Sequence, residues 1–204
     1  MSLWAIIPVK PLRRGKSRLA GVLSEDDREM LNLSLIGHTL QVVKKVKEIE
    51  HILVVSSDTA VLALARDQGA RTVMEDGKPG LNTALHRATM VAQMYSAQGV
   101  LILPSDLPLL TPDDLEEMIR QANEPPVVVI APDRRLEGTN ALLINPTGLI
   151  AYQFGEDSFN LHCAQAKKFN LNLKIVQTES LGLDLDFPED LEFFQQYEEK
   201  KVHL

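Results

Sequence analysis

Short, continuously apolar runs constrain the fold of this chain more than any other feature of its sequence. The clearest of them are Leu3–Val9, Val100–Leu103 and Val127–Ala131. Their residues do not alternate between apolar and polar, which is typical of strands buried on both faces of a parallel sheet, although a buried helical turn gives the same signal. Stretches with the apolar spacing of amphipathic helices separate these runs. We therefore expect an α/β protein, with a mostly parallel sheet covered by helices on both faces.

The same pattern gives the expected order of elements. Strands are expected at 3–9, 51–56, 71–74, 100–103, 127–131, 140–145 and 173–177. Helices are expected at about 24–46, in a segment that ends near 68, and at about 82–97, 112–122, 148–153, 159–169 and 188–199. Ser24 and Asp27 match a capping box at the start of the first helix. Neither a repeat nor a linker interrupts this order, so we expect residues 1–204 to form one domain.

Composition argues against several classes of protein. The formal net charge of −7 disfavours a surface that wraps nucleic acid, although a local cluster of Lys and Arg would still suit a small anion. Cys163 is the only cysteine, so no internal disulfide can form and a reducing compartment is expected. Leu3–Val9 is too short for a signal peptide, and no run approaches the ~20 apolar residues of a membrane span. We expect a cytoplasmic protein with no membrane partner.

One carboxylate follows the central apolar run. Asp106 lies just beyond Val100–Leu103, in the segment Ser105-Asp106-Leu107-Pro108. Ligands of open α/β sheets bind outside the carboxyl ends of the strands, and a carboxylate there suits Mg²⁺ beside a nucleotide phosphate. An Asp that only caps a turn is the competing interpretation.

A basic loop follows the first apolar run. Five cations lie close together in it: Lys10, Arg13, Arg14, Lys16 and Arg18. Gly15-Lys16-Ser17 resembles part of a phosphate-binding P-loop, but Lys10 stands where that motif needs its first glycine, so we reject a P-loop. Lys10, Lys16 and Arg18 would still suit a triphosphate. A solvated basic loop is the alternative.

Two further carboxylates are spaced two residues apart in Leu183-Asp184-Leu185-Asp186. In an extended chain this spacing places both on one side. Together with Asp106 they would form a set of hard oxygen ligands suited to Mg²⁺. Asp186 has a competing role as the N-cap of the following helix, with Glu189 completing a capping box. Asp184 has no such role, so it is the better ligand of the two.

A third candidate region combines Gly138-Thr139-Asn140 with Gly155–Ser158. Ser158 occupies a position typical of a helix N-cap, and the N-terminus of a helix offers free N–H groups to a phosphate. Capping and tight turns would explain these residues equally well. The five histidines show no metal-ligand spacing and pair with no nucleophile, so we interpret them as structural or surface residues: His38, His51, His86, His162 and His203.

Several short motifs together resemble one enzyme family, the 2-phospho-L-lactate guanylyltransferases, which make a guanylylated precursor of the deazaflavin coenzyme F420. The motifs occur in the family's order and span nearly the whole chain: Ile7–Lys10, Lys16–Leu19, Gly80–Leu85, Ser105–Pro108, Pro132–Arg134, Gly138–Leu142 and Asp184–Asp186. The wider group comprises nucleotidyltransferases with a Rossmann-like, glycosyltransferase-A-like sheet, including the molybdenum-cofactor guanylyltransferases. Those usually open with a glycine-rich loop, whereas Pro8–Pro11 stands here, which favours the phospholactate branch.

The resemblance implies roles for particular residues. It assigns GTP binding to the loop that contains Lys10, Lys16, Ser17 and Arg18 and to Asn82, and it assigns Mg²⁺ binding to Asp106, Asp184 and Asp186. Asp106 and Lys16 would carry catalysis. Thr139, Gly155 and Ser158 match positions that bind the phospho-acid. Leu136 departs from the pattern, because a glycine is expected in the turn before Gly138, and this affects the expected shape of the acceptor loop.

The implied reaction suits these residues. A phosphate oxygen of the acceptor would attack the α-phosphorus of GTP and expel pyrophosphate, and it needs no general base because the second pKa of a phosphate monoester is about 6. Phosphoenolpyruvate, 2-phospho-L-lactate and 3-phosphoglycerate remain open as acceptors. Another nucleotidyltransferase, acting on a sugar phosphate or the molybdenum cofactor, is the main alternative, and a non-catalytic nucleotide-binding regulator is a second. A homodimer would be unsurprising.

Overall fold

A seven-stranded sheet forms the centre of the protein in a computed structural model that describes residues 2–75 and 80–202. The strand order is β3-β2-β1-β4-β6-β5-β7. The strands are β1 (Leu3–Pro8), β2 (Ile49–Ser56), β3 (Arg71–Met74), β4 (Gly99–Ile102), β5 (Val127–Pro132), β6 (Thr139–Asn145) and β7 (Asn172–Ile175). The helices are α1 (Glu25–Val43), α2 (Thr59–Asp67), α3 (Leu81–Met94), α4 (Pro112–Gln121), α5 (Ser158–Lys168), α6 (Glu179–Gly182) and α7 (Pro188–Val202), with a 3₁₀ turn, η1 (Ser17–Leu19).

The sheet is mostly parallel, as the sequence predicts, with β6 as the reversed strand. β6 pairs antiparallel with both of its neighbours, β4 and β5, while the other pairings are parallel. The loop 133–138 between β5 and β6 is too short for the crossover that a parallel pair requires. The reversal brings the first residues of β6, Thr139 and Asn140, to the edge of the sheet where the other strands have their carboxyl ends.

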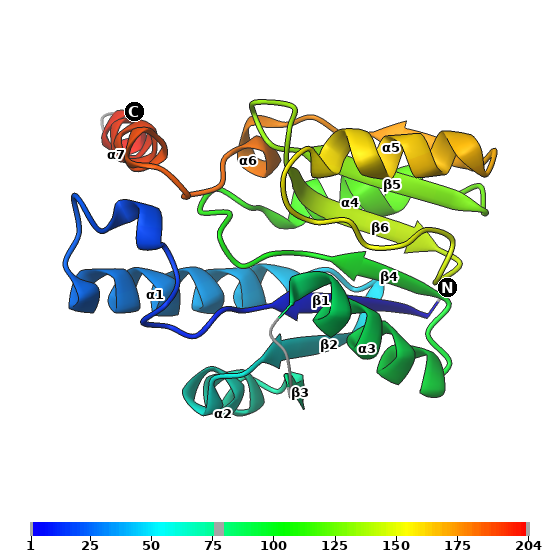
Figure 1. Ribbon diagram of the computed structural model, residues 1–204, viewed down its shortest axis with the longest axis horizontal. Helices are drawn as coiled ribbons and strands as arrows, with labels where there is room; N and C mark the ends of the chain where they lie inside the picture. The colour runs from blue at the N-terminus through cyan, green and yellow to red at the C-terminus, as the bar shows by residue number, and fades with distance from the viewer. Residues whose placement is uncertain (1, 76–79, 203–204) are drawn as a thin grey trace.

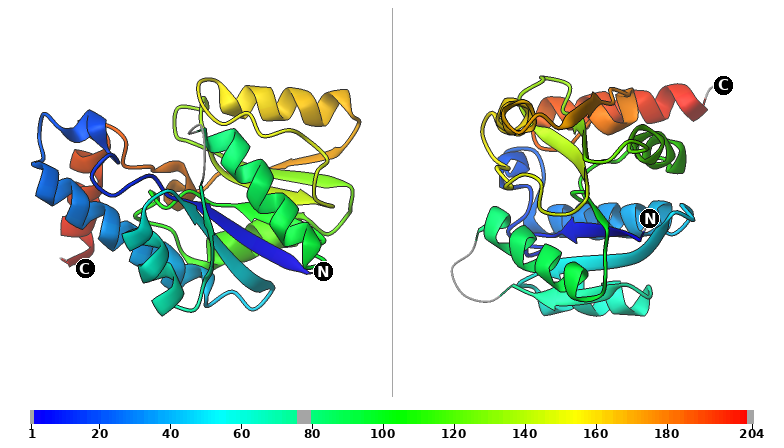
Figure 2. Two further views of the ribbon diagram at one scale, coloured as in Figure 1. Left: turned by 60° about the horizontal axis from the view of Figure 1, so that its bottom comes forward. Right: turned by 90° about the vertical axis from the view of Figure 1, so that its right-hand side faces the viewer.

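Helices cover both faces of the sheet, as Figures 1 and 2 show. Alternate residues of β1 point to opposite faces: Leu3, Ala5 and Ile7 pack in one apolar cluster with α1, α2 and α4. Trp4 and Ile6 pack in a second cluster with α3 and α5. The run is continuously apolar because both of its faces are buried. None of the helices in the described part of the chain is both long enough and apolar enough to cross a membrane.

Local capping agrees with the sequence at two helices. Ser24 and Asp27 form the predicted capping box of α1, and Thr111 and Asp114 form one at α4. The short elements η1 and α6 were not expected. The expected helix at 148–153 is wrong, because residues 148–150 form a turn and a bend and residues 151–153 have no regular secondary structure.

Side chains of α3 and α5 explain why residues 151–154 form no helix. Gln165 bonds both the N–H and the C=O of Ala151, and His162 Nε2 accepts from the N–H of Gln153. Asn82 bonds both the N–H and the C=O of Phe154. These side chains take up backbone groups that a helix would use for itself. We call residues 151–154 the strap.

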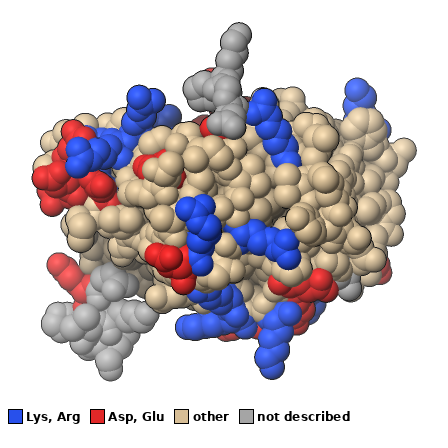
Figure 3. Space-filling model, turned by 90° about the horizontal axis from the view of Figure 1, so that it is seen from below, with Lys and Arg blue, Asp and Glu red and all other residues tan. Residues whose placement is uncertain are grey.

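Charged side chains are interspersed on the surface that Figure 3 shows. Lys and Arg lie among Asp and Glu there, with broad areas of neither kind. On the described part of this face the cations do not form one continuous basic field.

Candidate active site

Two of the three carboxylates predicted to bind metal, those of Asp106 and Asp186, meet at the carboxyl edge of the sheet, around the ammonium group of Lys16. Lys16 Nζ lies 3.0 Å from Asp106 Oδ2 and 3.3 Å from Asp186 Oδ1. The backbone N–H of Leu185 donates to the carbonyl of Asp106 at 3.1 Å, which ties the two acidic segments together. Asp184 lies between Leu183 and Leu185 in this segment, so the structure brings all three predicted ligands into one cluster. We call Lys16, Asp106, Asp184 and Asp186 the acid cluster.

Lys16 is held in an unusual conformation. Its backbone has φ 56° and ψ 35°, in the left-handed region, which costs a non-glycine residue on the order of 1 kcal/mol. Its side chain is only 6% exposed. Burial acts to lower the pKa of Lys16, but the Asp106 and Asp186 carboxylates outweigh that effect and raise the pKa above its ordinary value. Lys16 is therefore a fixed positive charge inside the cluster.

Asp184 is the carboxylate without a cation. Burial, followed by repulsion from Asp106, Asp186 and Asp190, raises the pKa of Asp184 to about 6. Among the described residues no Lys or Arg lies within ion-pair distance of it, and the amide Nδ2 of Asn140 lies 3.5 Å from its Oδ1. An additional cation would stabilise the ionised form of this carboxylate, because opposite charge lowers its pKa.

Asp186 does not cap α7, contrary to the competing role that the sequence allowed. Its Oδ2 accepts from Arg18 Nη1 at 3.0 Å, and its Oδ1 faces Lys16. The Arg18 guanidinium also lies 4.7 Å from the ring centroid of Phe187, and that of Arg135 lies 4.8 Å from the same ring. The carboxylate of Asp186 is thus directed toward the basic loop and away from the helix.

The residue that fixes the start of α7 is Asp190, which the sequence analysis missed. Asp190 is fully buried, and its carboxylate accepts from the backbone N–H groups of Asp186 and Phe187. Arg134 and Arg135 donate to the same carboxylate. The available signal was its spacing, because an acid three residues after Phe187 can reach back to the first N–H groups of the helix, as in a capping box. The arginines that share it come from the distant β5–β6 loop.

The predicted phospho-acid residues also meet. The N–H of Phe159, the second residue of α5, donates to the carbonyl of Glu137 at 3.0 Å, which ties α5 to the loop before Thr139. The N–H of Ser158 approaches the carbonyl of Gly155 at 3.3 Å. Ser158 is buried and is the first residue of α5, and Asp157 occupies the N-cap position that the sequence analysis gave to Ser158.

The remaining predicted nucleotide ligands differ in their surroundings. Lys10, Ser17 and Arg18 are exposed on the loop after β1. Asn82 is different, because both atoms of its side-chain amide bond the backbone of Phe154, at 2.8 and 3.1 Å. Its side chain thus joins the first turn of α3 to the strap.

Leu136, the departure from the family pattern, has φ 60° and is 46% exposed. A glycine adopts this left-handed conformation without strain, whereas leucine does not.

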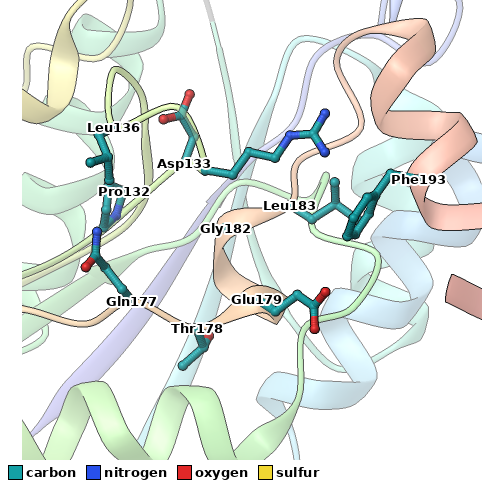
Figure 4. A pocket seen from close by; sticks show the side chains of 10 residues that line it. Pro132, Asp133, Leu136, Gln177, Thr178, Glu179, Gly182, Leu183 and Phe193 are labelled. Carbon is teal, nitrogen blue, oxygen red and sulfur yellow. The ribbon is translucent and has the colours of Figure 1, made fainter.

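Two hollows are lined by described residues, and one of them reaches Leu183, beside the acid cluster. One, of about 180 Å³, lies between the β5–β6 loop, α6 and α7. Figure 4 shows Leu183 beside Phe193 on one side of it and Asp133 and Leu136 on the other. The second, of about 340 Å³, lies between α3 and the segment 148–152, and Asn82 is among its lining residues.

The acid cluster offers only oxygen donors of the kind that Mg²⁺ prefers. Within residues 2–75 and 80–202, however, no three His, Cys, Asp or Glu side chains are already placed around one point as metal ligands would be. The ammonium of Lys16 lies between Asp106 and Asp186.

Known proteins resemble this chain along nearly its whole length. The family model described as "Guanylyl transferase CofC like" matches residues 3–202. A phosphoenolpyruvate guanylyltransferase of Rubrobacter xylanophilus is 39% identical over 191 residues, which cover 94% of this chain and 92% of that protein. One of Sphaerobacter thermophilus is 36% identical over 192 residues, with 94% and 92% covered. The solved structure of a nucleotidyl transferase from Methanothermobacter thermautotrophicus shares the fold, with a TM-score of 0.72 at 15% identity, over 96% of this chain and 97% of that one.

Proposed function

Since this chain belongs to the CofC-like guanylyl transferase family and is a nucleotidyltransferase, we propose that it joins GMP from GTP to the phosphate of a small phospho-acid. The observation that carries this proposal is the acid cluster, in which one ammonium group lies between two carboxylates at the edge of the sheet. Ligands of this sheet type bind at that edge. The relatives at 39% and 36% identity are named for phosphoenolpyruvate, so it is the first acceptor we propose, and 2-phospho-L-lactate is the second.

The proposed reaction forms one bond and breaks one. A phosphate oxygen of the acceptor attacks the α-phosphorus of GTP, and the bond from that phosphorus to the bridging oxygen of the β-phosphate breaks. Pyrophosphate leaves with the electron pair. The acceptor is already largely dianionic at neutral pH, so the protein needs no general base. Its task is to bring two anions together in line, which is a matter of positioning and charge neutralisation.

The two sides of the site divide this task. Lys16 and Arg18, on the side of the basic loop, neutralise the triphosphate. The acceptor binds on the other side, near Thr139, Gly155 and Ser158, at the start of α5, where the positive end of the helix dipole favours an anion.

We also propose that the reaction uses Mg²⁺. Asp106, Asp184 and Asp186 would hold the ion, since they are hard oxygen donors and no described Lys or Arg forms an ion pair with Asp184. The bound ion would neutralise charge on the transferring phosphate. Asp106 and Asp186 would then exchange part of their contact with Lys16 for contact with the metal, leaving the ammonium group available to the nucleotide.

The test is mass spectrometry of products formed from GTP and a panel of phosphoenolpyruvate, 2-phospho-L-lactate and 3-phosphoglycerate, with release of pyrophosphate measured in parallel. We expect a guanylylated phospho-acid and an equal amount of pyrophosphate, and the preferred acceptor decides whether the product lies on the route to coenzyme F420. CTP and UTP with sugar phosphates are the matched controls. Turnover of those substrates alone would refute the proposed substrates, and absence of pyrophosphate with every pair would indicate a nucleotide-binding protein without this catalysis.

A further inference from the structure

His162 is fully buried in α5, one helical turn after Ser158, and both of its ring nitrogens have partners. Nε2 accepts from the backbone N–H of Gln153 at 3.0 Å. Nδ1 lies 3.0 Å from Oγ1 of Thr139. The ring of Phe154 meets it edge-on, with 5.1 Å between centroids. The imidazole therefore connects the strap to the first residue of β6.

The strap determines which nitrogen of His162 carries the proton. A backbone N–H can only donate, so Nε2 must present its lone pair to Gln153. Burial lowers the pKa of His162 to about 4, so the ring is neutral at pH 7. A neutral imidazole has one N–H, and here it is on Nδ1. The Nδ1–H group can only donate, so the oxygen of Thr139 is the acceptor in that bond.

The arrangement also assigns the proton of Thr139. Its hydroxyl has one hydrogen, and its oxygen already accepts from His162. Within the described part of the chain Oγ1 of Thr139 has no other hydrogen-bond partner. Its hydrogen is therefore free for a ligand, and an oxygen that accepts one bond becomes a better donor in the next. Such a hydroxyl suits an anionic oxygen.

We propose that His162 is a positioning residue that presents the Thr139 hydroxyl as a hydrogen-bond donor to the acceptor's phosphate or carboxylate. This inference rests on the proposed function. The location supports it, because Thr139 begins the reversed strand β6 and so lies at the carboxyl edge of the sheet. The Glu137–Phe159 backbone bond keeps Thr139 beside the start of α5. His162 touches no reacting atom in this scheme, and it acts through Thr139.

Two readouts test the proposal. The first is ¹⁵N NMR of histidine-labelled full-length protein at pH 7, which should show His162 neutral with its proton on Nδ1. A proton on Nε2, or on both nitrogens, would overturn the proposal. The second is kinetics with GTP and phosphoenolpyruvate. Thr139→Val should raise the acceptor KM by about tenfold or more, the usual effect of losing a hydrogen bond to a charged group, while the KM for GTP stays within about twofold. Thr139→Ser, which keeps the hydroxyl, should raise the acceptor KM less.

A matched pair of variants isolates the histidine. In His162→Asn the side-chain amide lies near the position of Nδ1 and can donate to Thr139, whereas in His162→Gln it extends toward the position of Nε2 and can serve only Gln153. We expect His162→Gln to raise the acceptor KM by about tenfold and His162→Asn to raise it less. His162→Gln combined with Thr139→Val should resemble Thr139→Val alone, because the two residues act through one bond.

Thermal denaturation checks that the variants fold, and Thr89→Val is the control for removing a buried threonine hydroxyl elsewhere, since Thr89 bonds Tyr152 at 2.6 Å. Two results would overturn the inference: equal acceptor KM values for His162→Asn and His162→Gln, or an unchanged acceptor KM in folded Thr139→Val. Neither result affects the proposed function as long as the wild-type protein turns over GTP and phosphoenolpyruvate. A wild-type protein that neither turns over nor binds phosphoenolpyruvate by calorimetry would overturn both.

Discussion

The acid cluster and the acceptor side of the site differ in charge and in how far their polar groups are already bonded. In the acid cluster, Asp106 and Asp186 share the ammonium group of Lys16, and no described Lys or Arg forms an ion pair with Asp184. On the acceptor side, His162 is neutral and the strap has its backbone bonded by Asn82, His162 and Gln165. The first region has excess negative charge that a bound cation would offset, whereas in the second the backbone of the strap is already bonded without a ligand. Changes in the first should therefore affect turnover, and changes in the second should affect stability and acceptor binding.

The largest effect is expected at Asp106. Asp106→Asn keeps the size of the side chain but removes its charge, so turnover should fall by about a hundredfold or more while the thermal midpoint changes little. Titration with Mg²⁺ should show weaker binding in the presence of nucleotide. Near wild-type turnover at limiting Mg²⁺ would show that the acid cluster does not bind the metal.

The second-largest effect is expected at Asp186. Asp186→Ser should lose turnover by about tenfold or more and remain folded, because Asp190 holds the start of α7. Asp190→Ala provides the contrast, because its loss leaves two arginines without their buried partner and should lower the free energy of unfolding by about 3 kcal/mol. Urea denaturation and steady-state kinetics on both variants separate the two roles. An active, folded Asp186→Ser enzyme would remove Asp186 from the site.

Asp184 makes the acid cluster sensitive to pH. Its folded-state pKa of about 6 lies above the ordinary 3.8, so the folded protein binds more protons than the unfolded chain between these values. Stability from this group is therefore present at low pH and is lost as pH rises from about 4 to 6. The upper limit of this contribution to the free energy of unfolding is ~3 kcal/mol, and contact of Asp184 with solvent reduces it.

Asp184→Asn should remove that dependence. The measurement is the difference in unfolding free energy between wild type and Asp184→Asn at pH 4 and pH 7, without divalent metal. The variant should gain stability relative to wild type at pH 7. An equal difference at both pH values would show that the carboxyl of Asp184 is not perturbed.

The smallest effect is expected on the acceptor side, at Asn82. Asn82→Ala removes both bonds to the backbone of Phe154 and should lower the free energy of unfolding by about 1–3 kcal/mol. Turnover at saturating substrates should fall much less than in Asp106→Asn. A loss confined to the KM for GTP, with unchanged stability, would instead support the direct nucleotide contact that the family resemblance implies.

Features that leave a local pattern in the sequence could be predicted, and features that depend on contacts between different elements could not. The strands were predictable because burial on both faces leaves continuous apolar runs, as in β1, and Asp106 because it directly follows one. The strap was not, because its partners lie on other elements: Gln165 and His162 on α5, and Asn82 on α3, 72 residues away. Asp190 was missed for the same reason, since its two arginines lie more than fifty residues away. Local pattern allowed Asp186 two roles, and only tertiary contact showed that its carboxylate faces Lys16 and Arg18.

The reversed strand has a consequence for the order of folding. β5 and β6 are joined by residues 133–138 alone, so this hairpin closes a short loop and should form early, at little entropic cost. Lys16 and Asp186 are separated by 170 residues, so the acid cluster requires both ends of the chain in place. We therefore expect the acceptor side to acquire its shape first, and the chemistry to become available only when folding is complete. A chain that stops short of α7 would resemble the enzyme in much of its sheet and still be unable to catalyse.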